Sequence, residues 1–130
     1  MVTAALTVVV ASASAAQADT CRKVKTPIKD FTVCGAALNW TSKTMHAATL
    51  DRGQACTVFD THGKKLGSMK CTKRDVKPNA TAKFRDTDAV MFPSSYKINE
   101  NTIPGGSWIK IKVAVVCVNP LNTQVRCYGY

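Results

Sequence analysis

The chain has 130 residues, and its 18 Lys and Arg against 8 Asp and Glu give a formal net charge of +10. This length corresponds to one domain, and an apolar content of 45% excludes disorder throughout the chain. After residue 18, no uncharged apolar run is long enough to span a bilayer.

The first 18 residues have the pattern of a signal peptide, although the usual basic residue near the start is missing. Their apolar stretch covers Ala4–Ala11, and they end in Ala16-Gln17-Ala18, an A-x-A cleavage pattern. The alternative is an uncleaved anchor, but a spanning helix needs about 20 strongly apolar residues. We therefore expect cleavage before Asp19 and a single extracellular β-rich domain over residues 19–130.

Short predicted strands follow one another along this domain, separated by turns rich in Gly, Pro, Asn and Asp. The predicted strands are Phe31–Cys34, Ala37–Trp40, Ala55–Phe59, Leu66–Cys71, Ala89–Phe92, Tyr96–Ile98, Trp108–Val118 and Gln124–Tyr128. Helical spacing is absent, except that Thr41–Thr49 is compatible with one helical turn. The pattern predicts an all-β fold, a small disulfide-stabilised barrel or sandwich of short antiparallel strands.

The strongest periodic signal lies in Trp108–Val118. Alternate residues from Ile109 to Cys117 are apolar, and the opposite face begins with Trp108, Lys110 and Lys112 and then also becomes apolar. Such a run predicts one strand that enters the middle of a sheet. Trp108 would then lie on an open face beside two lysines, whereas we expect Trp40 in the core.

Six cysteines in a short exported chain predict a disulfide framework, but their number alone leaves the connectivity open. Cys56 and Cys71 are equidistant from the turn signal His62-Gly63-Lys64-Lys65. A two-residue loop at Gly63-Lys64 would place them directly opposite each other, with Val58 opposite Met69. Cys117 and Cys127 flank Asn119-Pro120-Leu121-Asn122 in the same way, which leaves Cys21 with Cys34.

Enzymatic and metal-dependent functions find little support. A secreted ribonuclease would need two histidines and a lysine around one phosphate. However, His62 lies at a predicted turn tip and His46 lies in a polar loop without a visible partner. There is no Cys-x-x-Cys or zinc-type cluster, and the spacing of Asp86 and Asp88 is too short for a calcium loop. We assign no catalytic residue, metal or cofactor.

Glycosylation sequons occur at Asn39 and Asn79.

Basic residues occur in clusters, the first of which contains Arg22, Lys23, Lys25 and Lys29. The predicted binding residues belong to two further clusters: Lys64, Lys65, Lys70, Lys73, Arg74 and Lys77, and Lys110 and Lys112 with Trp108. Such a density of cations favours salt-sensitive binding of polyanions such as nucleic acid, teichoic acid, anionic lipid or acidic glycan. The alternative is a solvated face that keeps an exported protein soluble.

Three short segments resemble the opening of bacterial SH3-like domains: Leu38-Asn39-Trp40-Thr41-Ser42, Thr49-Leu50-Asp51-Arg52-Gly53-Gln54 and Cys56-Thr57-Val58. Those domains often read Leu-Asn-x-Arg-Ser, a loop, and Thr-Leu-x-x-Gly-x before a strand. Here Thr41 replaces the arginine, and the family's Gly-Pro loop is missing. The resemblance implies a small half-open β-barrel, exported and binding cell-wall peptide or glycan, but transfers no binding residue. The composition also resembles that of small secreted cysteine-rich effectors of fungi and oomycetes.

Three functions remain as hypotheses. We expect a secreted, monomeric, non-catalytic module that binds an anionic polymer, a glycan or a membrane surface. The second hypothesis is a toxin, antimicrobial or host-directed effector that acts on membranes or a host protein. The third is a protease inhibitor in which the basic loop Thr72–Thr81 is presented extended and Lys73-Arg74 enters a trypsin-like pocket.

Overall fold

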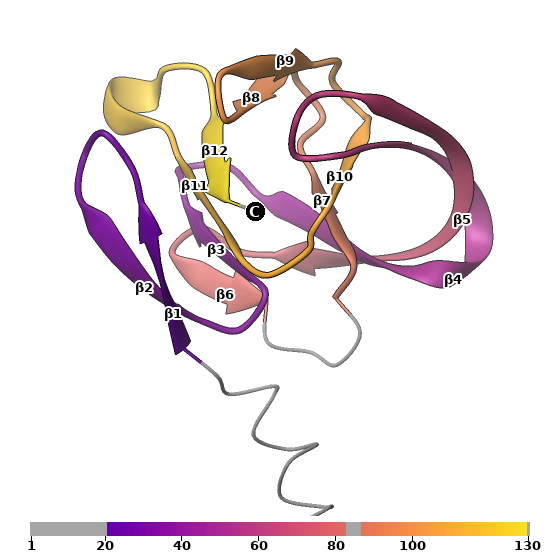
Figure 1. Cartoon of the computed structure of the whole chain (residues 1–130), viewed down its shortest axis with the longest axis horizontal. Helices are drawn as coiled ribbons and strands as arrows, with labels where there is room; N and C mark the ends of the chain where they lie inside the picture. Colours follow the sequence, from indigo (N-terminus) through magenta and orange to yellow (C-terminus); the bar gives the residue numbers. More distant parts are fainter. Residues whose placement is uncertain (1–20, 83–86, 130) are drawn as a thin grey trace, which may run out of the picture.

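The computed structural model describes residues 21–82 and 87–129, so the predicted signal peptide lies outside the described residues. The described part of the chain is built almost entirely of strands, which confirms the all-β class (Figure 1). None of its helices is long and apolar enough to cross a membrane. The elements are β1 (Cys21–Lys25), β2 (Asp30–Cys34), β3 (Ala37–Trp40), β4 (Met45–Phe59), β5 (Lys65–Val76), β6 (Ala80–Ala82), β7 (Ala89–Met91), β8 (Tyr96–Ile98), β9 (Asn101–Ile103), β10 (Trp108–Lys110), β11 (Val115–Val118), the 3₁₀ turn η1 (Pro120–Asn122) and β12 (Arg126–Gly129).

The described strands form three sheets. One has the order β6-β3-β11-β12-β8-β9, the second has the order β10-β7-β4-β5, and β1 pairs with β2 alone. The pairings are mixed, because β11 runs parallel to β3, β12 parallel to β8 and β10 parallel to the end of β4. The prediction that the strands are antiparallel was therefore wrong for these three pairings.

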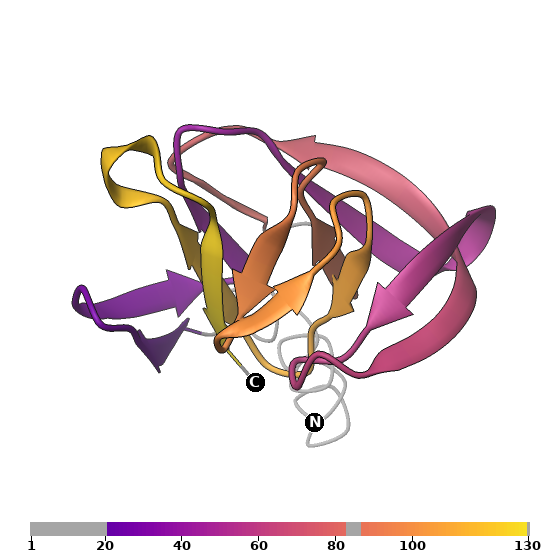
Figure 2. The ribbon, with the colours of Figure 1, turned by 90° about the horizontal axis from the view of Figure 1, so that it is seen from above.

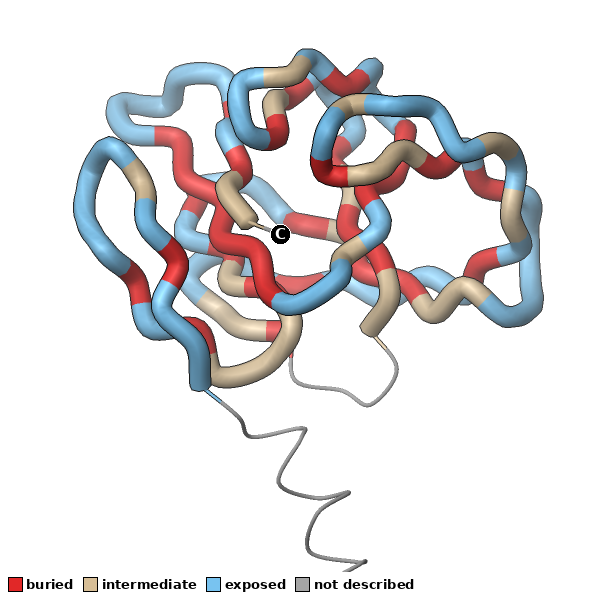
Figure 3. Tube along the Cα trace, in the orientation of Figure 1, coloured by how far each residue is buried: buried red, intermediate tan, exposed pale blue. Residues whose placement is uncertain are grey.

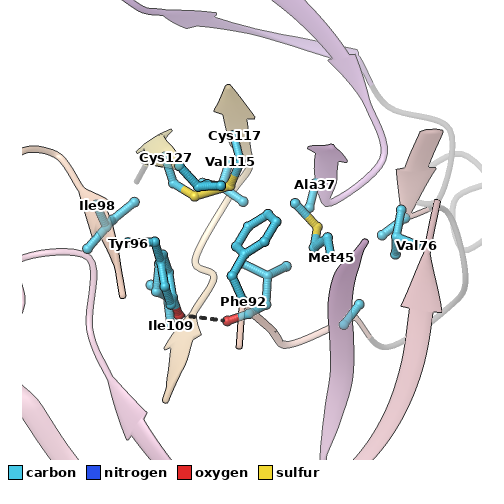
Figure 4. Packing of buried hydrophobic residues seen from close by; sticks show 14 of the residues in the cluster. Ala37, Met45, Val76, Phe92, Tyr96, Ile98, Ile109, Val115, Cys117 and Cys127 are labelled. Atoms are coloured by element: carbon cyan, nitrogen blue, oxygen red, sulfur yellow. Dashed lines mark hydrogen bonds between the residues drawn. A yellow bond between two sulfur atoms is a disulfide. The ribbon is translucent and has the colours of Figure 1, made fainter. Parts of the chain in front are cut away.

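The main core lies between the two larger sheets, which gives the molecule a sandwich-like arrangement (Figure 3). Phe92 and Tyr96 lie at its centre with their rings 5.5 Å apart, edge to face (Figure 4). The Tyr96 hydroxyl donates to the carbonyl oxygen of Ser107, so this buried polar group is satisfied. Burial raises the pKa of Tyr96 because the phenolate would be desolvated.

The segment 108–118 is two strands, not the single strand that its alternation predicted. β10 belongs to the four-stranded sheet and β11 to the six-stranded sheet. Between them, the N–H of Ile111 donates to Asp88 O at 2.8 Å and the N–H of Val115 donates to Ala36 O at 3.0 Å, which holds the crossing segment. The expected central position is correct for β11, whose four residues are all buried. One face of β11 lies in the main core, and the β1–β2 hairpin covers the other.

β4 and β5 form a long hairpin that curls back onto the molecule (Figures 1 and 2). The curl occurs where the register shifts between Thr49 and Gln54, and Gly53 there has a φ of +111°. A Cβ at Gly53 would collide with the backbone of Cys71, so the bend requires glycine. At the hairpin tip, the Asn99 side chain donates to Thr61 O at 3.2 Å. The predicted helical turn at Thr41–Thr49 was wrong, because β4 begins at Met45.

All three predicted disulfides are present: Cys21–Cys34, Cys56–Cys71 and Cys117–Cys127. The first and third join residues directly opposite each other in antiparallel pairs.

The register predicted for the second disulfide was wrong, because Cys56 faces Met69 and Cys71 faces Gln54. The turn starts earlier than expected, since the Asp60 carboxylate accepts the N–H groups of His62 and Lys64, each at 2.9 Å. Cys56 and Cys71 are therefore diagonal neighbours, with their Cα atoms 6.0 Å apart.

Candidate functional site

The predicted basic clusters do not form one patch. Lys64 and Lys65 lie at the tip of the β4–β5 hairpin, Lys70 lies along β5, and Lys77 follows the end of β5. The backbone N–H of Lys64 contributes most to lowering the pKa of Asp60, and the nearby charge of Lys112 contributes in the same direction. Lys112 therefore lies close to this tip. We call Lys64, Lys65 and Lys112 the hairpin-tip lysines.

The two tryptophans have exchanged the positions expected for them. Trp108 is 3% exposed and packs beside the Cys56–Cys71 disulfide, so it does not form an open binding edge with Lys110 and Lys112. Trp40, expected in the core, is 43% exposed at the end of β3. Its ring meets that of Phe31 edge to face at 5.1 Å, which fixes its orientation.

Trp40 forms one wall of an open groove of about 360 Å³. This volume lies at the lower end of the range for small-molecule sites, ~300–1,000 Å³. The lining residues come from the loop after β3, the turn between β5 and β6, and the loop after β11. They are Trp40, Thr41, Ser42, Pro78, Asn79, Asn119, Leu121 and Asn122, and we call this site the Trp40 groove.

Buried amide side chains hold the three segments of the groove together. The Asn39 amide nitrogen donates to the carbonyl oxygens of Lys43, Val76 and Lys77 at 2.8, 3.0 and 3.2 Å. The Asn119 side chain accepts from the N–H of Ser42 at 3.0 Å and donates to its hydroxyl at 2.9 Å. The groove is therefore formed before any ligand binds, which reduces the entropy cost of binding.

Leu121 is presented to solvent in an unusual conformation. Its side chain is 96% exposed and its φ is +57°, in the left-handed region that a bulky residue rarely adopts. The neighbouring turn is fixed, because the Thr123 hydroxyl donates to Pro120 O at 2.7 Å and the Cys117–Cys127 disulfide joins the strands behind it. A strained, fully exposed apolar residue on a braced turn is typical of a functional contact.

Two side-chain amides of the groove have their hydrogen-bonding capacity available. Neither Asn79 nor Asn122 uses its side chain in a hydrogen bond to a described residue, although the backbone N–H of each is bonded. Both residues have a positive φ, 60° and 55°, so the backbone places these amides in fixed turns. Each amide offers a carbonyl acceptor and two N–H donors.

Three lysines lie beside residues that line the groove. The ammonium group of Lys29 lies 5.3 Å from the centre of the Trp40 ring. Lys43 follows Ser42 and Lys77 precedes Pro78 in the chain, and the backbone carbonyls of both lysines accept from the same Asn39 amide. No described carboxylate forms a salt bridge with any of the three. We call Lys29, Lys43 and Lys77 the groove lysines.

The two histidines that a ribonuclease site would require lie in different surroundings. His46 pairs with Asp75 across β4 and β5, with Nδ1 2.8 Å from Oδ1. His62 lies in the hairpin turn, and no interaction in the described part of the chain joins it to His46. Among the described residues, no group of three or more His, Cys, Asp or Glu side chains is arranged to hold a metal.

Burial distinguishes the two glycosylation sequons. Asn39 is fully buried and its amide is occupied, so no glycan can be attached in the folded protein. Asn79 is exposed at the rim of the Trp40 groove.

The dibasic pair predicted for protease inhibition does not lie in an extended loop. Lys73 and Arg74 lie in β5, paired with Ala48 and Ala47, and only residues 77–79 separate β5 from β6. A dibasic pair fixed in a sheet cannot enter a protease cleft in extended form.

Comparison of the chain with protein families, curated proteins and solved structures finds no match. The resemblance to SH3-like domains therefore stays a prediction, and the function is inferred from the geometry.

Sequence reasoning missed most of the groove. Leu121 and Asn122 were considered only as a turn between two cysteines, and Lys43 stands outside every basic cluster. The sequence did contain one signal, because Leu121 is an apolar residue in a polar turn flanked by Cys117 and Cys127. Burial in the core does not explain a leucine at such a position.

Proposed function

We propose that this chain is an exported, non-catalytic module that binds an acidic glycan in the Trp40 groove. The observation that carries the proposal is an exposed tryptophan at a preformed groove, with its ring held by Phe31 and the ammonium group of Lys29 beside it. A flat aromatic ring packs against the apolar face of a sugar, while amides and hydroxyls bond its polar groups. The groove lysines would attract the carboxylates or sulfates of such a polymer. The three disulfides support an oxidising, extracellular location.

Replacing Trp40 with alanine should weaken binding of polygalacturonate by about 5- to 30-fold, because the lost aromatic contact contributes about 1–2 kcal/mol. Isothermal titration with polygalacturonate measures this, and uncharged dextran of similar length tests the requirement for charge. The matched control is Leu66→Ala, since Leu66 is 40% exposed on β5, away from the groove. Equal affinity of the wild-type protein for dextran and polygalacturonate would contradict the proposal.

A further inference from the structure

The Trp40 groove combines features that a plain acidic polymer does not need. The groove lysines would attract the carboxylates of such a polymer, and Trp40 would pack on the ring face of a sugar. Neither accounts for Leu121, which is held almost fully exposed in a left-handed conformation at the same groove. Beside Leu121 lie two side-chain amides, Asn79 and Asn122, whose donors and acceptors have no described partner. These three residues call for a ligand group that is apolar at one end and amide-like at the other.

An acetamido group has this chemistry. Its methyl group would pack on the Leu121 side chain, and its N–H and carbonyl would pair with the carbonyl and N–H groups of an asparagine amide. From the free amides and the exposed leucine, together with the groove lysines, we infer that the groove binds an N-acetylated sugar that neighbours an acidic sugar. This inference rests on the proposed function and specifies its ligand.

Charge and apolar contact would be supplied by different parts of the site. The ammonium group of Lys29 lies over the rings of both Phe31 and Trp40, at 4.9 and 5.3 Å, on the Trp40 side of the groove. Leu121 and Asn122 come from the turn after β11, a separate wall. Variants of that turn should therefore change the preference for the acetamido group without removing the affinity for carboxylates.

The test compares three oligosaccharides by tryptophan fluorescence. Trp40 is the exposed tryptophan of the described chain and Trp108 is buried, so ligand-induced changes report on the groove. Hyaluronan hexasaccharide carries three carboxylates and three acetamido groups, trigalacturonate carries three carboxylates only, and chitohexaose is neutral with acetamido groups. We expect hyaluronan to bind about tenfold tighter than trigalacturonate, because one methyl burial and one amide hydrogen bond are added.

Leu121→Ser and Asn122→Gly should each reduce this preference at least severalfold, because they lower the affinity for hyaluronan much more than the affinity for trigalacturonate. Glycine at position 122 keeps the positive φ, so the turn retains its shape. Leu66→Ser, an exposed leucine on β5, is the control and should leave the preference intact.

The outcomes separate the two levels of the proposal. Equal affinity of the wild-type protein for hyaluronan and trigalacturonate would overturn the acetamido inference and leave acidic-glycan binding in place. Failure of both acidic sugars to bind would overturn the proposed function itself. Chitohexaose binding as tightly as hyaluronan would contradict the requirement for an acidic neighbour.

Discussion

Replacing the three groove lysines with serine, as Lys29→Ser, Lys43→Ser and Lys77→Ser in one variant, should lower the affinity for an acidic glycan by about 10- to 100-fold. Exposed ion pairs contribute up to about 1 kcal/mol each, and three of them contact one ligand in the proposed complex. The affinity of the wild-type protein should fall steeply as salt rises, and the variant should show a shallower dependence. Titrations at several ionic strengths measure both effects.

The matched control removes the same charge elsewhere, from the hairpin-tip lysines Lys64, Lys65 and Lys112. The hairpin tip lies well apart from the turn after β11 in both ribbon views (Figures 1 and 2). If net charge alone caused binding, the two triple variants would lose affinity equally. We expect the control to lose less than about threefold, because only the weak long-range attraction decreases. Equal losses in the two variants would contradict a localised site.

Removing the Cys117–Cys127 disulfide should cause the largest loss of stability. Both cysteines are fully buried in the main core, and they join β11 and β12 in the middle of the six-stranded sheet. We expect the double variant Cys117→Ala and Cys127→Ala to lose about 2–5 kcal/mol of unfolding free energy, the range for native disulfides of small domains. Urea denaturation followed by circular dichroism measures this loss.

The disulfide Cys21–Cys34 provides the comparison, because it joins the β1–β2 hairpin, which packs on the outside of the six-stranded sheet. Cys21 is exposed. Removing this bridge should loosen the hairpin and leave most of the cooperative transition in place. A greater loss of global stability from this pair than from Cys117–Cys127 would mean that the hairpin, and not the two large sheets, is the stabilising unit.

The sequence predicted local elements well where turn residues and alternation agree. β3 and β8 have the predicted bounds, and the cysteine spacing gave all three pairs. The register of the β4–β5 hairpin was not predictable from spacing, because it depends on the Asp60 carboxylate and on the bend at Gly53. The pairing of Cys56 with Cys71 was predicted correctly although the register was wrong, because disulfides also form between diagonal neighbours in a hairpin.

The positions of Trp40 and Trp108 depend on tertiary packing, which the alternation of apolar and polar residues in the sequence does not reveal. The run from Trp108 to Val118 alternates and becomes apolar on both faces only toward its end. The chain changes sheets within this run, and this brings Trp108 into contact with the long hairpin. Trp40 lies at the end of β3, where its ring contacts Phe31 of the β1–β2 hairpin and 43% of the residue stays exposed. The groove could not be predicted, because it combines three segments distant in the sequence.

Chemical-shift mapping by NMR tests the location of the binding site most directly. Titrating the ¹⁵N-labelled protein with trigalacturonate should shift the Trp40 indole signal and the side-chain amides of Asn79 and Asn122, and leave the hairpin tip unchanged. Shifts centred on Lys64, Lys65 and Lys112, with the Trp40 signal unmoved, would contradict the assignment of binding to the groove.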